Sequence, residues 1–244
     1  MSTFPILIRP FGVHAILVEW PKEVQESILT DILQFKEYLG TCLDAGTWEM
    51  VPAYNSLTLI QRGNTIDFKS FSEQLSVWYT EKKEVLAGPK FQWRLPVCYD
   101  LDFGIDLEDL SFRSGLSIPE IVALHTGNTY TVYGIGFLPG FMYLGGLDKA
   151  LEIPRKTTPR LNVAKGAVGV AGKQTGIYPQ DSPGGWNIIG NCSIPIFDAN
   201  KEPPCFVNVG DQIQFYSISR AAYDLHKIEG EVGIYKIEKI KLDA

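Results

Sequence analysis

The chain has 244 residues and a formal charge of −6, with 45% hydrophobic and 20% charged residues. This composition supplies a packed core and excludes a disordered chain, while the acidic balance argues against binding to nucleic acid. No apolar run reaches the roughly 18 residues of a membrane helix, and the start lacks a signal-peptide pattern, so we expect a cytoplasmic protein without a membrane partner. Four widely spaced cysteines without a CxxC pair are typical of a reduced chain.

The first 88 residues alternate between strand and helix patterns. Runs of branched and aromatic residues predict strands, and apolar residues spaced by three or four predict helices. The predicted elements are a strand at 13–20, a helix from Val24 to Leu39 that ends at Gly40, strands at 47–51 and 56–61, and a helix that begins near Ser70 with Ser70 and Glu73 as a capping box. This order predicts a small α+β domain over residues 1–88.

A boundary is predicted at 82–89, and residues 89–244 have a different character. Twelve of the 23 glycines fall between Gly134 and Gly190, among short runs of strand-forming residues. The predicted elements are a strand at 91–99, a short helix capped by Ser117 and Glu120 that ends at 126–127, and strands within 129–137, 166–172, 184–190, 193–197, 211–218 and 232–242. Short strands separated by glycine and proline indicate an all-β sandwich or barrel.

Residues 161–197, which we call the charge-poor segment, contain only three charged side chains in 37 positions. The segment is rich in glycine, which lets a backbone approach a ligand or another chain closely. One interpretation is therefore a ligand cleft or an interface with another chain. The other is a tightly wound barrel interior with glycine corners.

Few of the familiar motifs of catalysis are present. The run from Gly134 to Gly140 has the wrong spacing for a dinucleotide fingerprint, Gly172–Thr175 fails as a phosphate loop, and no GxSxG serine motif occurs. The three histidines are isolated, so no metal site is predicted. His125, at the predicted helix end, is either an imidazole that contacts free helix carbonyls or a proton carrier that faces a cleft.

The basic residues are more informative. Arg155, Lys156 and Arg160 surround a Thr-Thr-Pro turn, and Lys173 precedes Gln174 and Thr175. A guanidinium fork suits a carboxylate, and amide and hydroxyl groups add donors. This set could orient a small carboxylate or amide substrate, pair with a partner chain, or be solvated.

These residues lie in a stretch that resembles a known family. Residues 130–197 contain GFLPGFMYLGGL, IPRKTTPRLNVAKGAVGVAGKQTGIYPQDSPGGWNIIG and IFD, and upstream runs such as AILVEW and LPVCYD extend the likeness over nearly the whole chain. The pattern resembles the family of the 5-oxoprolinase B subunit (PxpB), which includes the kinase inhibitor KipI and the first component of allophanate hydrolase-like proteins. Met142, and Asn191 to Ser193, depart from the more usual family residues.

The resemblance implies an α+β N-terminal domain followed by an all-β cyclophilin-like barrel domain at 89–244. It also implies ATP-dependent opening of 5-oxo-L-proline, a small cyclic amide, by a complex with the A and C subunits of 5-oxoprolinase. Because this chain shows no nucleophile motif, metal cluster or phosphate loop, we expect it to be inactive alone, with the ATP site shared or on a partner. The alternatives are a KipI-like inhibitor of a sensor histidine kinase and an allophanate hydrolase-type component.

For the oxoprolinase reaction, the site must hold a carboxylate and stabilise charge on the former carbonyl oxygen. We expect Arg160 to bind the carboxylate, Gln174 and Thr175 to orient the substrate, and His125 to act as acid or base. Substrate or partner contacts are expected from Phe137, Pro139, Lys173, Tyr178, Pro179 and Trp186, with Tyr178 and Trp186 as an apolar wall.

Overall fold

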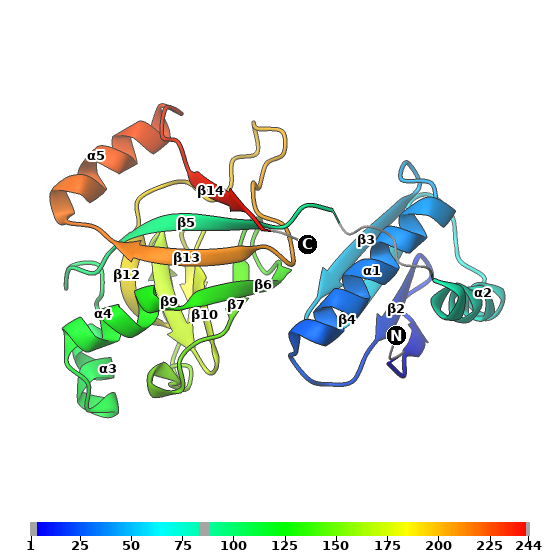
Figure 1. The fold of residues 1–244 in the computed structure, drawn as a ribbon, viewed down its shortest axis with the longest axis horizontal. Helices are drawn as coiled ribbons and strands as arrows, with labels where there is room; N and C mark the ends of the chain where they lie inside the picture. Colours follow the sequence, from blue (N-terminus) through cyan, green and yellow to red (C-terminus); the bar gives the residue numbers. More distant parts are fainter. Residues whose placement is uncertain (1–3, 83–87, 243–244) are drawn as a thin grey trace. The chain divides into compact units, whose positions relative to one another are not determined.

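The computed structural model describes residues 4–82 and 88–242 (Figure 1). The chain forms two compact units, with the division between Pro89 and Lys90, and each is described by itself. Residues 83–87 of the predicted boundary lie outside the described residues. Within the described ranges, no helix is long and apolar enough to cross a membrane.

The N-terminal unit is a four-stranded antiparallel sheet with two helices (Figure 1). The strands are β1 (Leu7–Pro10), β2 (Ala15–Glu19), β3 (Trp48–Ala53) and β4 (Ser56–Gln61), in the order β1-β2-β4-β3, and the helices are α1 (Glu26–Cys42) and α2 (Phe68–Glu81). Alternate residues of a strand point to one face. One core therefore collects Val18, Leu57 and Leu59 from the sheet with Ile32, Phe35 and Leu75 from the helices.

The predicted elements of this unit are confirmed, with three differences at helix ends, and strand β1 was not predicted. Helix α1 begins at Glu26 and not at Val24. Helix α1 continues through Gly40 to Cys42, because a glycine costs a helix only about 1 kcal/mol. Ser70 does not cap α2, which begins at Phe68 after Asp67. Phe68 packs against the core, so the apolar face of the helix starts before Ser70.

The C-terminal unit contains a closed barrel of seven strands, in the order β12-β9-β10-β7-β6-β13-β5, in which β5 pairs back to β12 (Figure 1). Strands β5 and β13 are parallel, and the other neighbours are antiparallel. The seven are β5 (Phe91–Cys98), β6 (Thr129–Ile135), β7 (Met142–Gly145), β9 (Ala167–Ala171), β10 (Gln174–Ile177), β12 (Asn187–Cys192) and β13 (Gln212–Ser217). Outside the ring, β14 (Glu238–Lys241) joins β5, and β8 (Arg160–Val163) pairs with β11 (Ser182–Gly184).

The prediction of an all-β second domain needs correction, because helices accompany the barrel. They are α3 (Leu107–Ser114), α4 (Ile118–Gly127), α5 (Arg220–Glu231) and the short 3-10 turn η1 (Lys149–Leu151). The Ser117–Glu120 capping box of α4 is confirmed. Helices α3 and α5 were missed, although Gly115 in the left-handed conformation ends α3 and the Ser219 side chain caps α5. The predicted strand at 193–197 does not form, and the predicted strand at 232–242 is confined to β14.

The charge-poor segment is mostly barrel wall. All residues of β9 and β12 are buried, and their side chains join the barrel cores. Buried charges need partners, so a segment that supplies two central strands carries few of them. The barrel interpretation therefore accounts for β9, β10 and β12, whereas residues near 178–186 and at 194–196 line pockets.

Candidate functional site

A pocket of about 410 Å³ lies in the C-terminal unit, where the charge-poor segment meets the loop before β8. Its lining combines aromatic rings with two cationic side chains. It is lined by Phe137, Phe141, Tyr143, Arg155, Lys156, Pro159, Tyr178, Pro183, Gly184, Gly185 and Trp186. Three residues predicted to contact substrate or partner, Phe137, Tyr178 and Trp186, are thus brought together in one place.

The aromatic wall is held rigid by edge-to-face packing. Phe141 lies with its ring centroid 5.2 Å from Tyr178 and 5.4 Å from Trp186, at interplanar angles of 80° and 89°. This geometry places the positive edge of one ring on the negative face of another. Burial raises the pKa of Tyr178, so its phenol stays neutral. The three rings are at most 2% exposed, so the wall is a rigid, preformed corner of the pocket that presents ring edges and small parts of the ring faces.

The cationic side of the pocket comes from residues 155 and 156. The Arg155 guanidinium lies 5.9 Å from the centre of the Trp186 ring, is exposed, and forms no ion pair with any residue that the structure describes. Cations stack favourably on an indole face. A planar anion could therefore lie on the aromatic wall and receive a charge-assisted hydrogen bond from Arg155.

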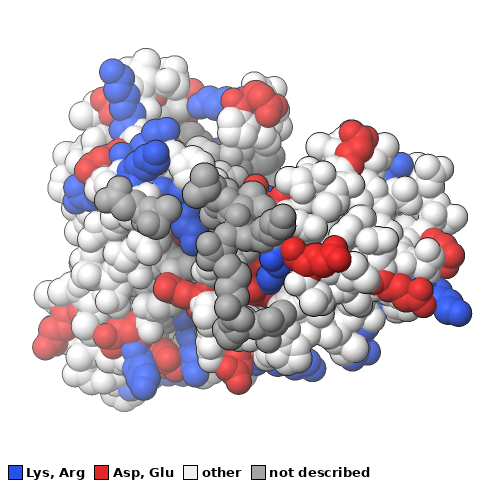
Figure 2. Space-filling view, turned by 45° about the vertical axis from the view of Figure 1, so that its right-hand side comes forward, with Lys and Arg blue, Asp and Glu red and all other residues white. Residues whose placement is uncertain are grey.

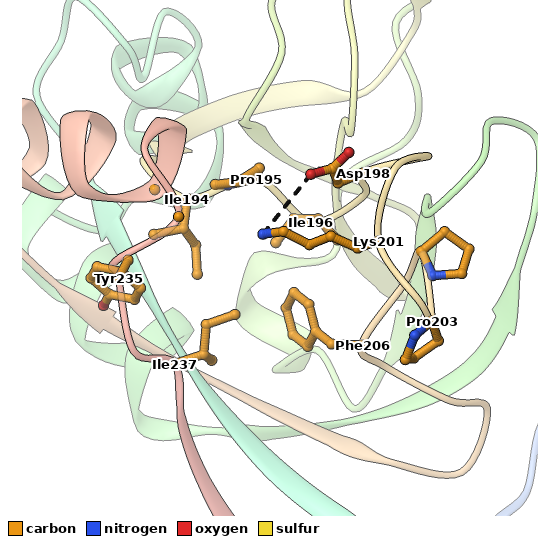
Figure 3. Close-up of a pocket in the computed structure, with 12 residues that line it drawn as sticks. Ile194, Pro195, Ile196, Asp198, Lys201, Pro203, Phe206, Tyr235 and Ile237 are labelled. Atoms are coloured by element: carbon orange, nitrogen blue, oxygen red, sulfur yellow. Dashed lines mark ion pairs between the residues drawn. The ribbon is translucent and has the colours of Figure 1, made fainter.

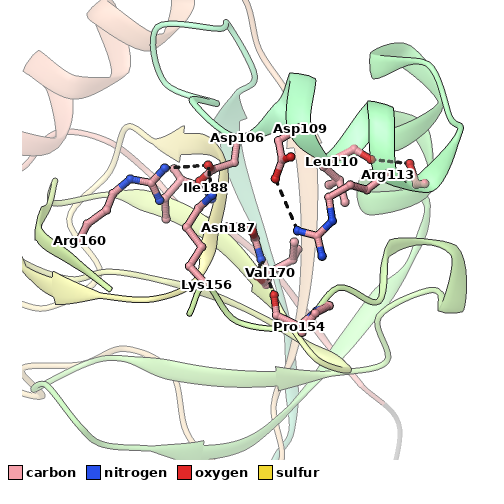
Figure 4. A network of polar contacts seen from close by, with 11 residues as sticks. Asp106, Asp109, Leu110, Arg113, Pro154, Lys156, Arg160, Val170, Asn187 and Ile188 are labelled. Atoms are coloured by element: carbon pink, nitrogen blue, oxygen red, sulfur yellow. Dashed lines mark hydrogen bonds and ion pairs between the residues drawn. The ribbon is translucent and has the colours of Figure 1, made fainter. Parts of the chain in front are cut away.

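Lys156 and Arg160 are bound to one buried carboxylate. Lys156 Nζ and Arg160 Nη2 each lie 2.7 Å from Asp106 Oδ1 (Figure 4). Burial alone would raise the pKa of Asp106, but hydrogen bonds from Arg160, Lys156 and the Ile188 amide lower it below its usual value. Arg160, the predicted carboxylate ligand, is therefore paired within the chain and does not line the pocket.

His125 and Thr175 lie inside the barrel, away from the pocket lining. Both are 0% exposed, and His125 Nε2 is 2.9 Å from Thr175 Oγ1. The Thr175 hydroxyl donates to Gly169 O at 3.0 Å, so it accepts from Nε2–H, and Nδ1 accepts from the Tyr99 hydroxyl at 2.7 Å. Burial lowers the pKa of His125 to about 3. The imidazole is thus a neutral internal bridge, and a role as acid or base at the pocket does not fit its position.

The burial of His125 predicts a pH dependence of folding. The folded chain keeps the imidazole neutral to about pH 3, whereas an unfolded histidine binds a proton near pH 6.5. The unfolded state therefore binds more protons in this interval, and the free energy of unfolding falls as pH decreases, by up to about 5 kcal/mol for this group. Urea unfolding at several pH values should show a flatter pH dependence in His125→Asn. Equal slopes in the wild type and His125→Asn would contradict the assignment.

The remaining predicted residues do not line this pocket. Gln174 and Thr175 pair with Gly145 and Leu144 across β10 and β7. Pro139, Lys173 and Pro179 are also absent from its lining. A second, smaller pocket of about 90 Å³ has a mainly apolar lining with one ion pair, Asp198–Lys201 at 3.9 Å (Figure 3), and it contains none of the predicted site residues.

Sequence reasoning missed Asp106, Phe141 and Tyr143. Asp106 stands directly before α3, where an aspartate is expected as a helix cap, so its pattern did not suggest a partner 54 residues away. Phe141 and Tyr143 lie in a strand-forming run, where aromatic residues are ordinary. One signal was available. Phe141 and Tyr143 are two positions apart in this run, and residues at that spacing point to the same face of a strand.

Comparisons with known proteins agree with this architecture. Residues 6–207 match the family model for the carboxyltransferase domain, subdomain C and D. The B subunit of 5-oxoprolinase from Bacillus subtilis is 33% identical over 232 residues, which cover 91% of this chain and 97% of that protein. The Haemophilus influenzae protein of the same name is 40% identical over 170 residues, 68% of this chain and 78% of that protein.

A solved structure extends the comparison of the fold. The Kluyveromyces lactis urea amidolyase matches 98% of this chain with a TM-score of 0.81 at 19% identity, and the chain spans 16% of that protein. The chain belongs to the carboxyltransferase domain, subdomain C and D family. Within this family, the likeness to the B subunit of 5-oxoprolinase that the sequence motifs indicate is confirmed.

Proposed function

We propose that this chain is the B subunit of an ATP-dependent 5-oxoprolinase, which opens 5-oxo-L-proline to L-glutamate in the cytoplasm together with the C and A subunits. The observation that carries the proposal is the 33% identity to a protein named as this component of 5-oxoprolinase, over 97% of its length. The predicted cyclophilin-like character of the barrel stays a prediction and gives no reason to propose prolyl isomerisation, because one fold hosts many functions.

The pocket supports a role in binding the substrate. 5-Oxoproline is a flat five-membered lactam that carries one carboxylate. In the proposed complex, the ring lies against Trp186 and Phe141, and the Arg155 guanidinium receives the carboxylate, with Lys156 adding positive charge nearby. This placement fixes the lactam carbonyl relative to the protein, which lowers the entropy cost of the reaction.

ATP supplies the activation of the lactam oxygen when the complex is assembled. We place its site on a partner or at a shared surface, because the pocket of this chain combines one exposed guanidinium with an aromatic wall rather than a phosphate loop. Figure 2 shows lysine and arginine side chains interspersed with acidic ones on the face in view. This mixture does not favour a nucleic-acid partner.

A second candidate is a component of a urea- or allophanate-type amide hydrolase. The Saccharomyces cerevisiae urea amidolyase favours it, since it is 36% identical over 136 residues, which cover 51% of this chain and 7% of that protein. The alternative of a KipI-like kinase inhibitor stays a prediction. In both cases the same pocket would serve a different partner.

Reconstitution tests the proposed function. The chain is to be co-purified with a candidate C subunit, mixed with the A subunit, and assayed for 5-oxoproline-dependent ATP hydrolysis and glutamate formation. We expect 5-oxoproline-dependent ATP hydrolysis only when all three chains are present. Full 5-oxoproline turnover without this chain would overturn the proposal. ATP hydrolysis that depends on urea and not on 5-oxoproline would overturn it as well. A fall in histidine-kinase autophosphorylation without any turnover would instead support the inhibitor alternative.

A further inference from the structure

The loop that carries the pocket cations has few contacts of its own. Residues 154–159 form neither helix nor strand and connect the Ile153 bridge to β8. The Lys156 amide donates to Gly185 O at 2.8 Å, which ties the loop to the opposite pocket wall. The Asn187 side-chain amide donates to Pro154 O at 3.1 Å at the start of the loop, and Lys156 and Arg160 bond to Asp106. We call residues 155–160 the cationic loop.

Asp106 is well placed to hold this loop. Its side chain is 4% exposed, and it is fixed to β12 at two points: the Asp106 amide donates to Ile188 O at 2.9 Å, and the Ile188 amide donates to Asp106 Oδ2 at 2.7 Å. Oδ2 is thus held by the barrel, while Oδ1 faces the two cations (Figure 4). The carboxylate therefore links β12 to Lys156 in the loop and to Arg160, the first residue of β8.

The contacts of Arg160 and Lys156 indicate that Asp106 is the main anchor. The second nitrogen of the guanidinium, Arg160 Nη1, is buried without a hydrogen-bond partner among the described residues. The Arg160 side chain is therefore held through Asp106, while its backbone pairs with Gly184 of β11. Lys156, at 24% exposed, would extend into water as a free ammonium without this carboxylate.

Charge also favours an anion in the pocket. Lys156, Arg160 and Asp106 sum to one positive charge, and Arg155 adds a second that no described residue pairs. If acidic side chains neutralised all of these cations, the pocket would have no net positive charge to attract the carboxylate of a ligand. The single Asp106 carboxylate holds the Lys156 and Arg160 side chains in place, and the pocket keeps a net positive charge.

We propose that Asp106 is a positioning residue: it fixes the cationic loop at the pocket and so makes the site select an anionic cyclic amide over a neutral one. This inference rests on the proposed function for the identity of the substrate. The anchoring of the loop itself is independent of any reaction.

The variant Asp106→Asn tests both parts. An asparagine oxygen can still accept from the Ile188 amide, but it carries no charge for Lys156 and Arg160. In the reconstituted complex, kcat and KM are to be measured for 5-oxoproline and for 2-pyrrolidinone, the same lactam without the carboxylate. We expect the preference for 5-oxoproline to fall about tenfold, mostly through KM. Amide hydrogen exchange at residues 155–160 should become faster in the isolated variant, because the loop loses its anchor.

A matched control lies three residues further along α3. Asp109 pairs with Arg113 at 3.5 Å, is half exposed, and does not line the pocket. Asp109→Asn should change neither the substrate preference nor the exchange of the cationic loop. Unchanged loop exchange in Asp106→Asn would overturn the proposal. So would faster exchange with an equal loss for both lactams, since that pattern indicates a purely structural role.

The two proposals can fail separately. If the wild-type complex does not turn over 5-oxoproline, the proposed function fails, while loop exchange still decides whether Asp106 anchors the loop. If the wild type is active but Asp106→Asn keeps its preference for 5-oxoproline, the inference about Asp106 fails and the proposed function stands.

Discussion

Replacing Arg155 with methionine is expected to raise the KM for 5-oxoproline in the reconstituted complex by about 10- to 100-fold, with a smaller effect on kcat. A hydrogen bond to a charged group contributes about 1.5–3 kcal/mol, which corresponds to this range. The methionine keeps an apolar side chain near the Trp186 ring, so the pocket loses charge more than shape. Steady-state kinetics over a range of 5-oxoproline concentrations measures the effect.

The fold should tolerate this change, because Arg155 is exposed and forms no ion pair with a described residue. Arg155→Lys should recover part of the affinity, since lysine keeps the charge but loses the planar fork. Arg113→Met, on the exposed side of α3, serves as the matched control and should leave KM unchanged. An unchanged KM in Arg155→Met would remove Arg155 from substrate binding.

The largest loss of stability is expected from Gly166→Ala. Gly166 has φ +81°, and an added Cβ would lie 2.5 Å from Cys192 O and would also clash with Asn191 Oδ1. Its amide donates to Tyr178 O, and its carbonyl accepts from the Cys192 amide, both at 2.7 Å, so the backbone cannot shift without breaking contacts with β12. We expect the free energy of unfolding to fall by about 3 kcal/mol or more, measured by urea titration.

Gly172→Ala is a control with the same kind of backbone conformation. Gly172 has φ +57°, but no atom lies within 4 Å of the position of an added Cβ. The free energy of unfolding of Gly172→Ala should fall by only about 1–2 kcal/mol, which is the cost of holding an alanine in the left-handed backbone conformation. Equal losses in the two variants would show that the close approach to Cys192 contributes nothing.

Much of the fold could be predicted from local patterns. The alternation at 56–61 and the Ser117–Glu120 capping box each depend on neighbours in the sequence, and β4 and α4 form at these places. Helix α5 lies between two strand-forming runs and was missed, although Ser219 provides a helix cap directly before Arg220. The small number of charged residues around β9 and β12 did not distinguish a ligand cleft from a barrel wall, because buried positions of either kind rarely hold charged side chains.

The site was harder to predict than the fold, because its key contacts join residues far apart in the sequence. Arg160 looked like the best carboxylate ligand, but a lone guanidinium in sequence does not reveal a buried acid 54 residues earlier. His125 looked available because a helix end is usually exposed, whereas stacking on Phe215, with centroids 4.7 Å apart, seals it in the barrel. Tyr178 and Trp186, predicted from an irregular run of Gly, Pro and aromatic residues, both line the pocket, and their role in binding stays a prediction.

The position of bound 5-oxo-L-proline in the assembled complex tests the central claim most directly. A crystal structure of the complex with this ligand should show its carboxylate within hydrogen-bond distance of the Arg155 guanidinium and its ring against Trp186. Well-ordered ligand at another site, with only water in the pocket lined by Arg155 and Trp186, would contradict the assignment of this pocket.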